Sequence, residues 1–349
     1  MPNGNFLPLP SDSSKYIAAT GTVPLKQGKP PDLPAHRCGT VAIIGRPNVG
    51  KSTLLNRFLG QKIAIVSPKP ETTRDRLLGV LTLPGVQILF IDTPGIYRGP
   101  KTLLGKHQIQ AAREALGEAD AVLMVSEAQA GITDQDREIF RMLPRVSHTD
   151  PAAGTPSFLA INKVDRVRKD LVLPQIAEAN RQGPPFREIF PISATKGDNV
   201  EALLKALAAA APEGPAHFPP DHITDRPMRV LAQELIREKA LLFTHEEIPH
   251  AVAVLVEEWK PGQKPQRGVP PSATKGPDPT YVRATIYVER DSQKGILIGK
   301  GGRLLKKIGQ EARKEIEDLT GGPVYLDLWI KVAKNWRRDP RMLRQFGYE

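Results

Sequence analysis

The 349-residue sequence contains a single cysteine, Cys38, so no disulfide can form within the chain. This excludes a disulfide-stabilised secreted module and favours a reducing compartment. The sequence also has no apolar run close to the roughly 20 residues that a membrane-spanning helix needs. Its first twenty residues carry scattered proline and serine instead of the apolar segment of a signal peptide. These absences predict a cytoplasmic protein.

The composition is that of a folded, basic protein. Hydrophobic residues make up 40% of the chain and charged residues 25%, which excludes a mainly disordered chain. The formal net charge is +11, and most of this excess lies after residue 225. A basic surplus of this kind indicates a polyanionic partner, and its position indicates that the C-terminal third makes the contact.

The order of predicted elements divides the chain into two folded units. Strands alternate with amphipathic helices over residues 37–212, which predicts an α/β domain with a mostly parallel sheet and helices on both faces. The order helix, strand, strand, helix, strand over residues 226–349 predicts a small α+β domain that ends in a basic tail. Residues 1–36 are expected to be a disordered N-terminal extension, 213–225 a linker and 260–280 a flexible insert.

Apolar runs and helical spacing give the bounds of the expected elements. In the first unit the expected strands are 40–44, 86–91, 121–125, 158–161 and 189–192, and the expected helices are 52–59, 104–116, 134–143, 171–179 and 200–210. In the second unit the expected helices are 229–242 and 303–319, and the expected strands are 251–259, 281–289 and 324–332.

A phosphate-binding loop is predicted directly after the first strand. The residues from Gly45 to Ser52 fit the pattern G-x-x-x-x-G-K-[ST], and they follow a strand and open a helix. The glycines let backbone N–H groups surround phosphate oxygens, and the helix N-terminus adds partial positive charge. Lys51 is expected to reach the β- and γ-phosphates, and Ser52 to bind Mg²⁺. The nucleotide contacts expected in this loop are Gly45, Arg46, Pro47, Asn48, Val49, Gly50, Lys51, Ser52 and Thr53.

A second motif, Asp92-Thr93-Pro94-Gly95, follows the next buried strand. An aspartate at this strand end can hold the Mg²⁺ shell, and the Gly95 N–H can bond the γ-phosphate, so the loop senses hydrolysis. The residue that follows is Ile96, at the position where signalling GTPases have a glutamine that orients the attacking water. An isoleucine cannot take that role. Residues 92–96 are assigned to the nucleotide site.

Two further motifs predict recognition of guanine. Asp165 can accept hydrogen bonds from both N1–H and N2–H₂ of guanine, a pair of donors that adenine lacks. Asn162 can bond the purine edge or tie loops together, and the stem of Lys163 can lie along the base. The residues of the two motifs are Asn162, Lys163, Val164, Asp165, Ser193 and Ala194. Because all four motifs follow strand ends, they meet at one crevice, which predicts GTP or GDP rather than ATP.

These motifs resemble those of translation-factor-related GTPases, and Glu71-Thr72-Thr73-Arg74-Asp75 is similar to the pattern of the TrmE–Era–EngA branch. The resemblance implies that Thr73, rather than Thr72, completes Mg²⁺ coordination when GTP is bound. It also implies that Asn48 helps to bind K⁺ between the phosphates, in place of an arginine finger; alternatively, Asn48 only caps the loop. The implied catalytic residues are Asn48, Lys51 and Thr73, and the implied Mg²⁺ ligands are Ser52, Thr73 and Asp92.

A G-x-x-G motif at Gly299–Gly302 lies between an apolar segment and a basic helix. This is the clamp of a KH domain, which holds about four single-stranded nucleotides. Alone, G-x-x-G is more often a turn between helices, but here the order of elements resembles the type II KH arrangement. The expected RNA contacts are Ile298, Gly299, Lys300, Gly301, Gly302, Arg303, Lys306 and Lys307. Trp259, Trp329 and Trp336 are expected to pack in or beside the core, and residues 334–344 to be either solvated or in contact with rRNA.

The whole pattern, a P-loop GTPase domain followed by a type II KH domain, resembles the Era-type GTPases over about residues 40–348. The resemblance implies a GTP-hydrolysing protein that binds small-subunit rRNA near its 3′ end and assists assembly of the small ribosomal subunit. It implies GTP or GDP, Mg²⁺ and K⁺ as cofactors. We expect a monomer with no DNA partner. Peripheral association with the inner membrane is mentioned for such proteins, although no lipidation motif is present in this sequence.

Two alternatives remain open at this point. One is a regulatory GTPase that acts at a membrane or on a protein partner and uses the KH fold as a docking scaffold. The other is an RNA-binding chaperone that binds GTP without meaningful hydrolysis.

Overall fold

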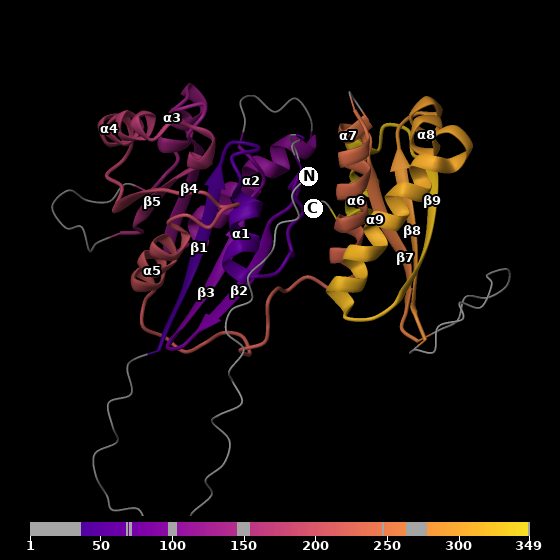
Figure 1. Cartoon of the computed structure of the whole chain (residues 1–349), viewed down its shortest axis with the longest axis horizontal. Helices are drawn as coiled ribbons and strands as arrows, with labels where there is room; N and C mark the ends of the chain where they lie inside the picture. The colour runs from indigo at the N-terminus through magenta and orange to yellow at the C-terminus, as the bar shows by residue number, and fades with distance from the viewer. Residues whose placement is uncertain are drawn as a thin grey trace, which may run out of the picture.

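The computed structural model describes residues 36–67, 69, 72–96, 103–144, 154–245, 248–262 and 278–347. Nearly all of the expected N-terminal extension and most of the expected 260–280 insert lie outside these residues, as do Glu71 and Tyr348. The described chain forms two units side by side, each around its own sheet (Figure 1).

The first unit is built on a six-stranded sheet in the order β2-β3-β1-β4-β5-β6. The strands are β1 Arg37–Gly45, β2 Leu77–Leu83, β3 Val86–Asp92, β4 Ala121–Glu127, β5 Ser157–Asn162 and β6 Glu188–Pro191. β2 pairs with β3 in antiparallel fashion, and every other pair in this sheet is parallel. The predicted mostly parallel sheet is confirmed.

Helices cover both faces of this sheet. They are α1 Lys51–Leu59, α2 Leu103–Glu118, α3 Asp134–Phe140, α4 Val172–Gln182 and α5 Val200–Ala210, with 3₁₀ turns at Val164–Arg166 and Lys169–Leu171. α1 and α5 pack on the face that holds Ile43, whereas α2, α3 and α4 pack on the face that holds Ile44. The two residues are adjacent in β1, and alternation along a strand sends them to opposite faces. Because both faces are covered, the strands read as continuous apolar runs.

The second unit is a three-stranded sheet in the order β7-β8-β9. Its elements are α6 Met228–Phe243, α7 Ile248–Ala251, β7 Ala253–Lys260, β8 Thr280–Val288, α8 Asp291–Ile298, α9 Arg303–Thr320, β9 Val324–Val332 and α10 Pro340–Gln345, with 3₁₀ turns at Lys300–Gly302 and Trp336–Arg338. β7 is antiparallel and β9 parallel to β8, and residues of α6, α8 and α9 pack on one face. The predicted helix, strand, strand, helix, strand order is confirmed, and the short helices α7, α8 and α10 add to it. None of the helices described is long and apolar enough to cross a membrane.

Residues 213–225, expected to be a linker, run along the first sheet rather than apart from it. The Val80 N–H donates to the Ile223 carbonyl at 2.7 Å. The buried Gln87 side chain accepts from the Phe218 N–H at 3.0 Å and donates to the Phe218 carbonyl at 2.8 Å. The segment between the units therefore has a fixed path, and the second unit starts from a defined point.

The C-terminal segment is docked on the second unit rather than surrounded by solvent, and contact of residues 334–344 with rRNA stays a prediction. Trp336 and Phe346 are buried with edge-to-face rings 5.3 Å apart, and Phe346 also contacts Tyr287 of β8. The indole N–H of Trp336 donates to the Ala251 carbonyl at 2.8 Å. Trp336 packs as expected, but Trp329 is 54% exposed, because alternation along β9 places it on the face opposite α9.

Replacing Trp336 with alanine is expected to lower the free energy of unfolding by about 3–5 kcal/mol, because it removes a fully buried ring and its hydrogen bond. Trp329→Ala is the matched control, with an expected change below about 1 kcal/mol because the ring is half in solvent. Urea denaturation followed by circular dichroism measures both. Equal losses for the two variants would contradict the docking of the C-terminal segment.

Candidate nucleotide and RNA sites

The four nucleotide motifs meet at a cleft of about 470 Å³ at the carboxyl ends of the parallel strands. The predicted residues that line it are Pro47, Asn48, Gly50, Lys51, Ser52, Thr53, Thr73, Gly95, Asn162, Lys163 and Ala194. Those that lie behind or beside it are Gly45, Arg46, Val49, Asp92, Thr93, Pro94, Ile96, Val164, Asp165 and Ser193. The lining residues that the sequence analysis does not name as contacts are Ile65, Val66, Ser67, Thr72, Glu127, Arg166 and Thr195.

Asn162 joins three of the loops around the cleft. Its amide donates to the Val49 carbonyl at 2.8 Å, and its side-chain oxygen accepts from the N–H groups of Lys163 at 2.8 Å and Ala194 at 3.0 Å. A Cβ atom at Gly50 would lie 2.3 Å from this amide, and Gly50 has φ 103°, so only glycine fits there. Of the two roles that the sequence leaves open for Asn162, the structure shows that it ties the loops together.

Two opposite charges are buried at the base of the cleft. The Lys51 ammonium donates to the carbonyls of Gly45 at 3.1 Å and Arg46 at 3.0 Å. Burial lowers the pKa of Lys51 to about 8, although Asp92 opposes the shift. Burial raises the pKa of Asp92 to about 6, opposed by Lys51 and by the hydroxyl of Ser52. A desolvated ammonium beside backbone N–H groups is suited to the phosphates of a nucleotide.

The three residues expected to bind Mg²⁺ lie together. The Ser52 hydroxyl donates to Asp92 Oδ2 at 2.7 Å and stands 3.0 Å from Thr73 Oγ1. Asp92 Oδ1 is buried and accepts no hydrogen bond from the described residues. Hard oxygen donors with an unsatisfied carboxylate oxygen fit Mg²⁺. Thr72 instead donates its hydroxyl to the Lys69 carbonyl at 2.7 Å, so the geometry agrees with the choice of Thr73.

The first turn of α3 braces two of the nucleotide loops. Both oxygens of the buried Asp136 lie 2.9 Å from Arg46 Nε, which turns this side chain away from the cleft. Gln135 donates to the carbonyl of the buried Ile96 at 2.6 Å. Neither Gln135 nor Asp136 is predicted from the sequence as part of the site. The available signal is the capping box at the start of α3, in which the Thr133 and Asp136 side chains bond each other's backbone N–H groups.

The guanine motifs are held in place by side-chain contacts. The Ser193 hydroxyl donates to Asp165 Oδ1 at 2.6 Å and so orients an otherwise exposed carboxylate. The Lys163 ammonium donates to the Asn48 carbonyl at 2.7 Å and pairs with Glu127 at 2.9 Å. This contact fixes the guanine loop to the phosphate loop.

The G-x-x-G loop joins α8 to α9 with three residues in the left-handed region. Gly299, Gly301 and Gly302 have φ values of 71°, 62° and 77°. A Cβ atom at Gly299 would stand 2.8 Å from the Cβ atom of Leu304, so a side chain there would collide with the start of α9. The loop therefore brings bare backbone to the surface.

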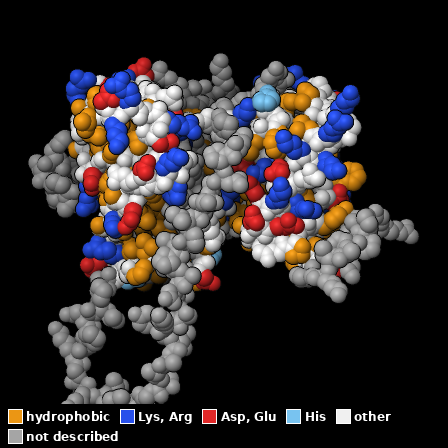
Figure 2. Space-filling model, viewed as in Figure 1, with side chains coloured by type: hydrophobic (Ala, Val, Ile, Leu, Met, Phe, Trp, Pro, Cys, Tyr) orange, Lys and Arg blue, Asp and Glu red, His pale blue; other side chains and the backbone are white. Residues whose placement is uncertain are grey.

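Exposed basic side chains surround this loop. Lys300, Arg303, Lys306 and Lys307 are all exposed, and the Lys307 ammonium lies over the Phe243 ring of α6 at 4.2 Å. Figure 2 shows basic side chains along the edge of the second unit where Figure 1 places α8. Ile298 packs on the core, and Ile296, which the sequence analysis does not assign, is 53% exposed. The exposed isoleucine offers an apolar contact beside the loop.

Known proteins share this combination of sites. A family model described as a 50S ribosome-binding GTPase matches residues 40–163, and one described as a KH domain matches residues 247–337. GTPase Era of Geobacter metallireducens is 48% identical over 312 residues, which cover 89% of this chain and 98% of that protein. GTPase Era of Heliobacterium modesticaldum is 46% identical over 313 residues, covering 90% and 97%. The chain belongs to the GTPase Era family.

Solved structures of the family agree in fold. A crystal structure of Era with MgGDPNP and nucleotides 1506–1542 of 16S ribosomal RNA aligns with a TM-score of 0.80 at 44% identity, covering 90% of this chain and 99% of that one. A crystal structure of an Aquifex aeolicus Era variant bound to GDP·AlF₄⁻ aligns with a TM-score of 0.80 at 43% identity, covering 89% and 99%. The predicted GTPase and KH domains are confirmed, and the chain is a GTPase that uses GTP, GDP and Mg²⁺.

Mg²⁺ binding is expected to weaken as the pH falls through about 6, because a proton then competes with the metal for Asp92. The carboxyl is mostly ionised at pH 7.5, whereas at pH 5 about nine in ten metal-free molecules carry the proton. The Mg²⁺ concentration that half-saturates binding of GDPNP should therefore rise roughly tenfold between these values. Asp92→Asn is the control, since any pH effect left in that variant belongs to the nucleotide. An unchanged Mg²⁺ requirement in the wild type would be inconsistent with the raised pKa.

Proposed function

We propose that the chain binds the 3′ region of small-subunit ribosomal RNA and assists assembly of the small ribosomal subunit, with GTP binding and hydrolysis controlling the contact. The main support is the exposed glycine loop with Lys300 and Arg303, in a chain 44% identical to an Era crystallised with a 16S rRNA segment. Phosphates and single-stranded bases are the ligands of such a loop. We further propose that the protein acts as a cytoplasmic monomer.

At the nucleotide site, we assign Lys51 to the β- and γ-phosphates and Asp165 to guanine. Ser52, Thr73 and Asp92 would hold Mg²⁺, which neutralises charge on the phosphates. Asp165 is oriented for this role by Ser193, and the loop that holds it is fixed to the phosphate loop through Asn162. The assignment explains why the motifs must converge: each recognises a different part of one ligand.

The described residues that line the cleft supply no free side chain to act as a general base. Glu127 is the only carboxylate among the described lining residues, and it is paired with Lys163 at 2.9 Å. Ile96 is buried and apolar, so it cannot orient water. We infer that charge stabilisation carries the hydrolysis and that intrinsic turnover is slow.

K⁺ is the cation that we propose to supply part of this stabilisation, with Asn48 as a ligand. Asn48 belongs to the phosphate loop and lines the cleft. GTP hydrolysis should be severalfold faster in KCl than in NaCl at equal ionic strength, and Asn48→Ala should remove the difference. Phosphate release at saturating GTP measures both rates. Equal rates in the two salts would favour the alternative in which Asn48 only caps the loop.

RNA binding provides the test of the whole function. A single-stranded RNA that matches the 3′ end of small-subunit rRNA should bind more tightly with GDPNP than with GDP, at a fixed and stated salt concentration. Lys300→Glu should weaken this binding at least tenfold by reversing a charge at the loop while leaving GTP hydrolysis intact. Lys314→Glu, an exposed change on α9 more than three turns beyond the loop, is the control and should have little effect.

Fluorescence anisotropy with labelled RNA measures binding by the wild type and the two variants, each with GDPNP and with GDP. Equal binding in the two nucleotide states would support the RNA site but contradict its control by GTP. Absence of binding in both states would direct attention to the docking-scaffold alternative.

A further inference from the structure

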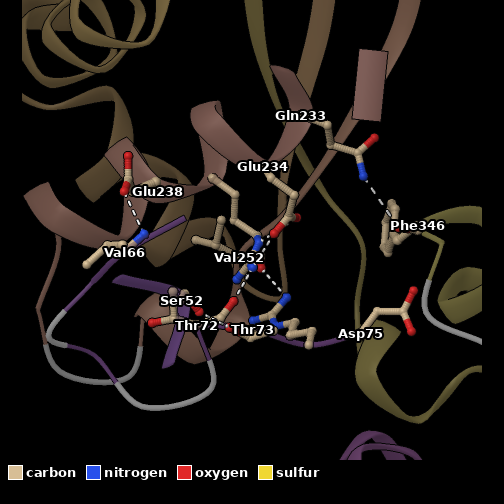
Figure 3. A network of polar contacts seen from close by, with 12 residues as sticks. Ser52, Val66, Thr72, Thr73, Asp75, Gln233, Glu234, Glu238, Val252 and Phe346 are labelled. Carbon is tan, nitrogen blue, oxygen red and sulfur yellow. Dashed lines mark hydrogen bonds and ion pairs between the residues drawn. The ribbon is translucent and has the colours of Figure 1, made fainter. Parts of the chain in front are cut away.

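The segment between α1 and β2 runs from the nucleotide cleft to the KH domain. The backbone N–H of Val66 donates to Glu238 Oε1 of α6 at 2.7 Å. Further along, the carbonyl of Thr72 accepts a hydrogen bond from the guanidinium of Arg237, the neighbouring residue on α6. Figure 3 shows Val66 and Thr72 beneath α6, with Ser52 and Thr73 next to Thr72. Two consecutive residues of one helix thus hold the main chain of this segment at two points.

The residue on the other side of Thr73 is also held by the KH domain. The Arg74 side chain is 4% exposed, donates to the Val252 carbonyl at 2.7 Å and lies 5.3 Å from the centre of the Trp336 ring. Thr72 and Arg74 are therefore both fixed to the second unit, while Thr73 Oγ1 stands 3.0 Å from Ser52 Oγ in the nucleotide site. The threonine expected at the metal sits between two contacts made by the other domain.

Arg237 is itself held in one direction. Its side chain is fully buried, and its Nε donates to Glu234 Oε1 at 2.9 Å, while a second guanidinium nitrogen bonds the other carboxylate oxygen. A forked contact of this kind sets the plane of the guanidinium before it meets Thr72. The geometry suits a group that positions its neighbour rather than one that adapts to it.

We propose that Arg237 is a positioning residue for GTP hydrolysis, which holds Thr73 at the Mg²⁺ site through the Thr72 carbonyl. The proposal rests on the metal role assigned to Thr73 above. In that role Thr73 would complete the metal shell only with GTP bound, so loss of Arg237 should affect the GTP state and spare the GDP state. The KH domain then supplies the guanidinium that keeps Thr73 of the GTPase domain in position for hydrolysis.

The first experiment compares Arg237→Met with the full-length wild type. The Mg²⁺ concentration that half-saturates binding of GDPNP should rise about tenfold, the effect of losing one charge-assisted hydrogen bond. Hydrolysis at limiting Mg²⁺ should fall by a similar factor, and affinity for GDP should stay the same. Arg229→Met, an exposed arginine about two turns earlier on α6, is the matched control and should leave all three values unchanged. An unchanged Mg²⁺ requirement in Arg237→Met would overturn the proposal.

A second variant covers the case in which Arg237→Met does not fold. Arg237→Lys keeps the positive charge beside Glu234 but cannot make the forked contact, so it should raise the Mg²⁺ requirement by a smaller factor. GDP binding, which does not need Thr73, reports whether each variant is folded. A wild-type Mg²⁺ requirement in a folded Arg237→Lys would equally count against the positioning role.

A double variant distinguishes positioning from a general structural role. If Arg237 acts through Thr73, then Thr73→Ala with Arg237→Met should need no more Mg²⁺ than Thr73→Ala alone. Multiplied effects in the double variant would overturn the proposal. Failure of Thr73→Ala to change the Mg²⁺ requirement would instead overturn the metal role of Thr73, on which the proposal rests. An effect of Thr73→Ala without one of Arg237→Met would overturn the positioning role alone.

Discussion

The residues from Thr72 to Arg74 have to fit two surfaces at the same time, and the relation between the two domains depends on this constraint. Thr73 faces the nucleotide site, where its hydroxyl lies 3.0 Å from that of Ser52, while its two neighbours bind the KH domain. Adjacent Cα atoms are only about 3.8 Å apart. A shift of Thr73 at the nucleotide site therefore also moves Thr72 and Arg74, which contact the KH domain. The backbone is thus a direct physical link between nucleotide and KH domain.

A cluster of charged side chains also joins the two domains, but it adds little to the stability of their interface. Lys62 of the first unit pairs with Glu238 at 2.6 Å and with Glu315 at 2.8 Å, and Lys239 contacts the same two carboxylates. Burial alone would lower the pKa of Lys239, but Glu238 and Glu315 more than offset it and raise the pKa. Partly buried ion pairs add little net stability because desolvation cancels most of the attraction. They do set one relative orientation, because a shifted interface would leave buried charges unpaired.

How far the sequence predicts the molecule depends on how local each feature is. The phosphate loop is encoded within eight residues by its two glycines, its lysine and its strand-to-helix context, and the structure agrees. The helix α8 is not predicted, because Gly295 interrupts a short segment whose start is fixed by a capping contact of Gln293. The role of Asn162 stays open in the sequence, since its bond to Val49 joins residues 113 positions apart.

The same reasoning explains the features that sequence patterns miss altogether. Polar contacts such as Gln87 with the linker, or Arg237 with Thr72, join residues more than 100 positions apart and leave no periodic signal. The partners of Trp336 are similar: its burial is expected from the sequence, but its bond to the Ala251 carbonyl joins residues 85 positions apart. Short-range motifs identify the ligands of this protein, whereas the tertiary contacts determine how one site affects the other.

The strength of the contacts between the domains limits how much the nucleotide can change the affinity for RNA. A hydrogen bond to a charged group contributes roughly 1.5–3 kcal/mol, and coupling between sites in proteins is typically about 1–3 kcal/mol. Making or breaking the Arg237 contact alone is therefore enough to change affinity at the other site by about ten- to a hundredfold. A larger set of permanent contacts would hold the domains in one state whatever nucleotide was bound. The described residues of the cleft offer no free side-chain base to speed hydrolysis. The state that GTP favours would therefore persist long enough for a weak, reversible link to control RNA binding.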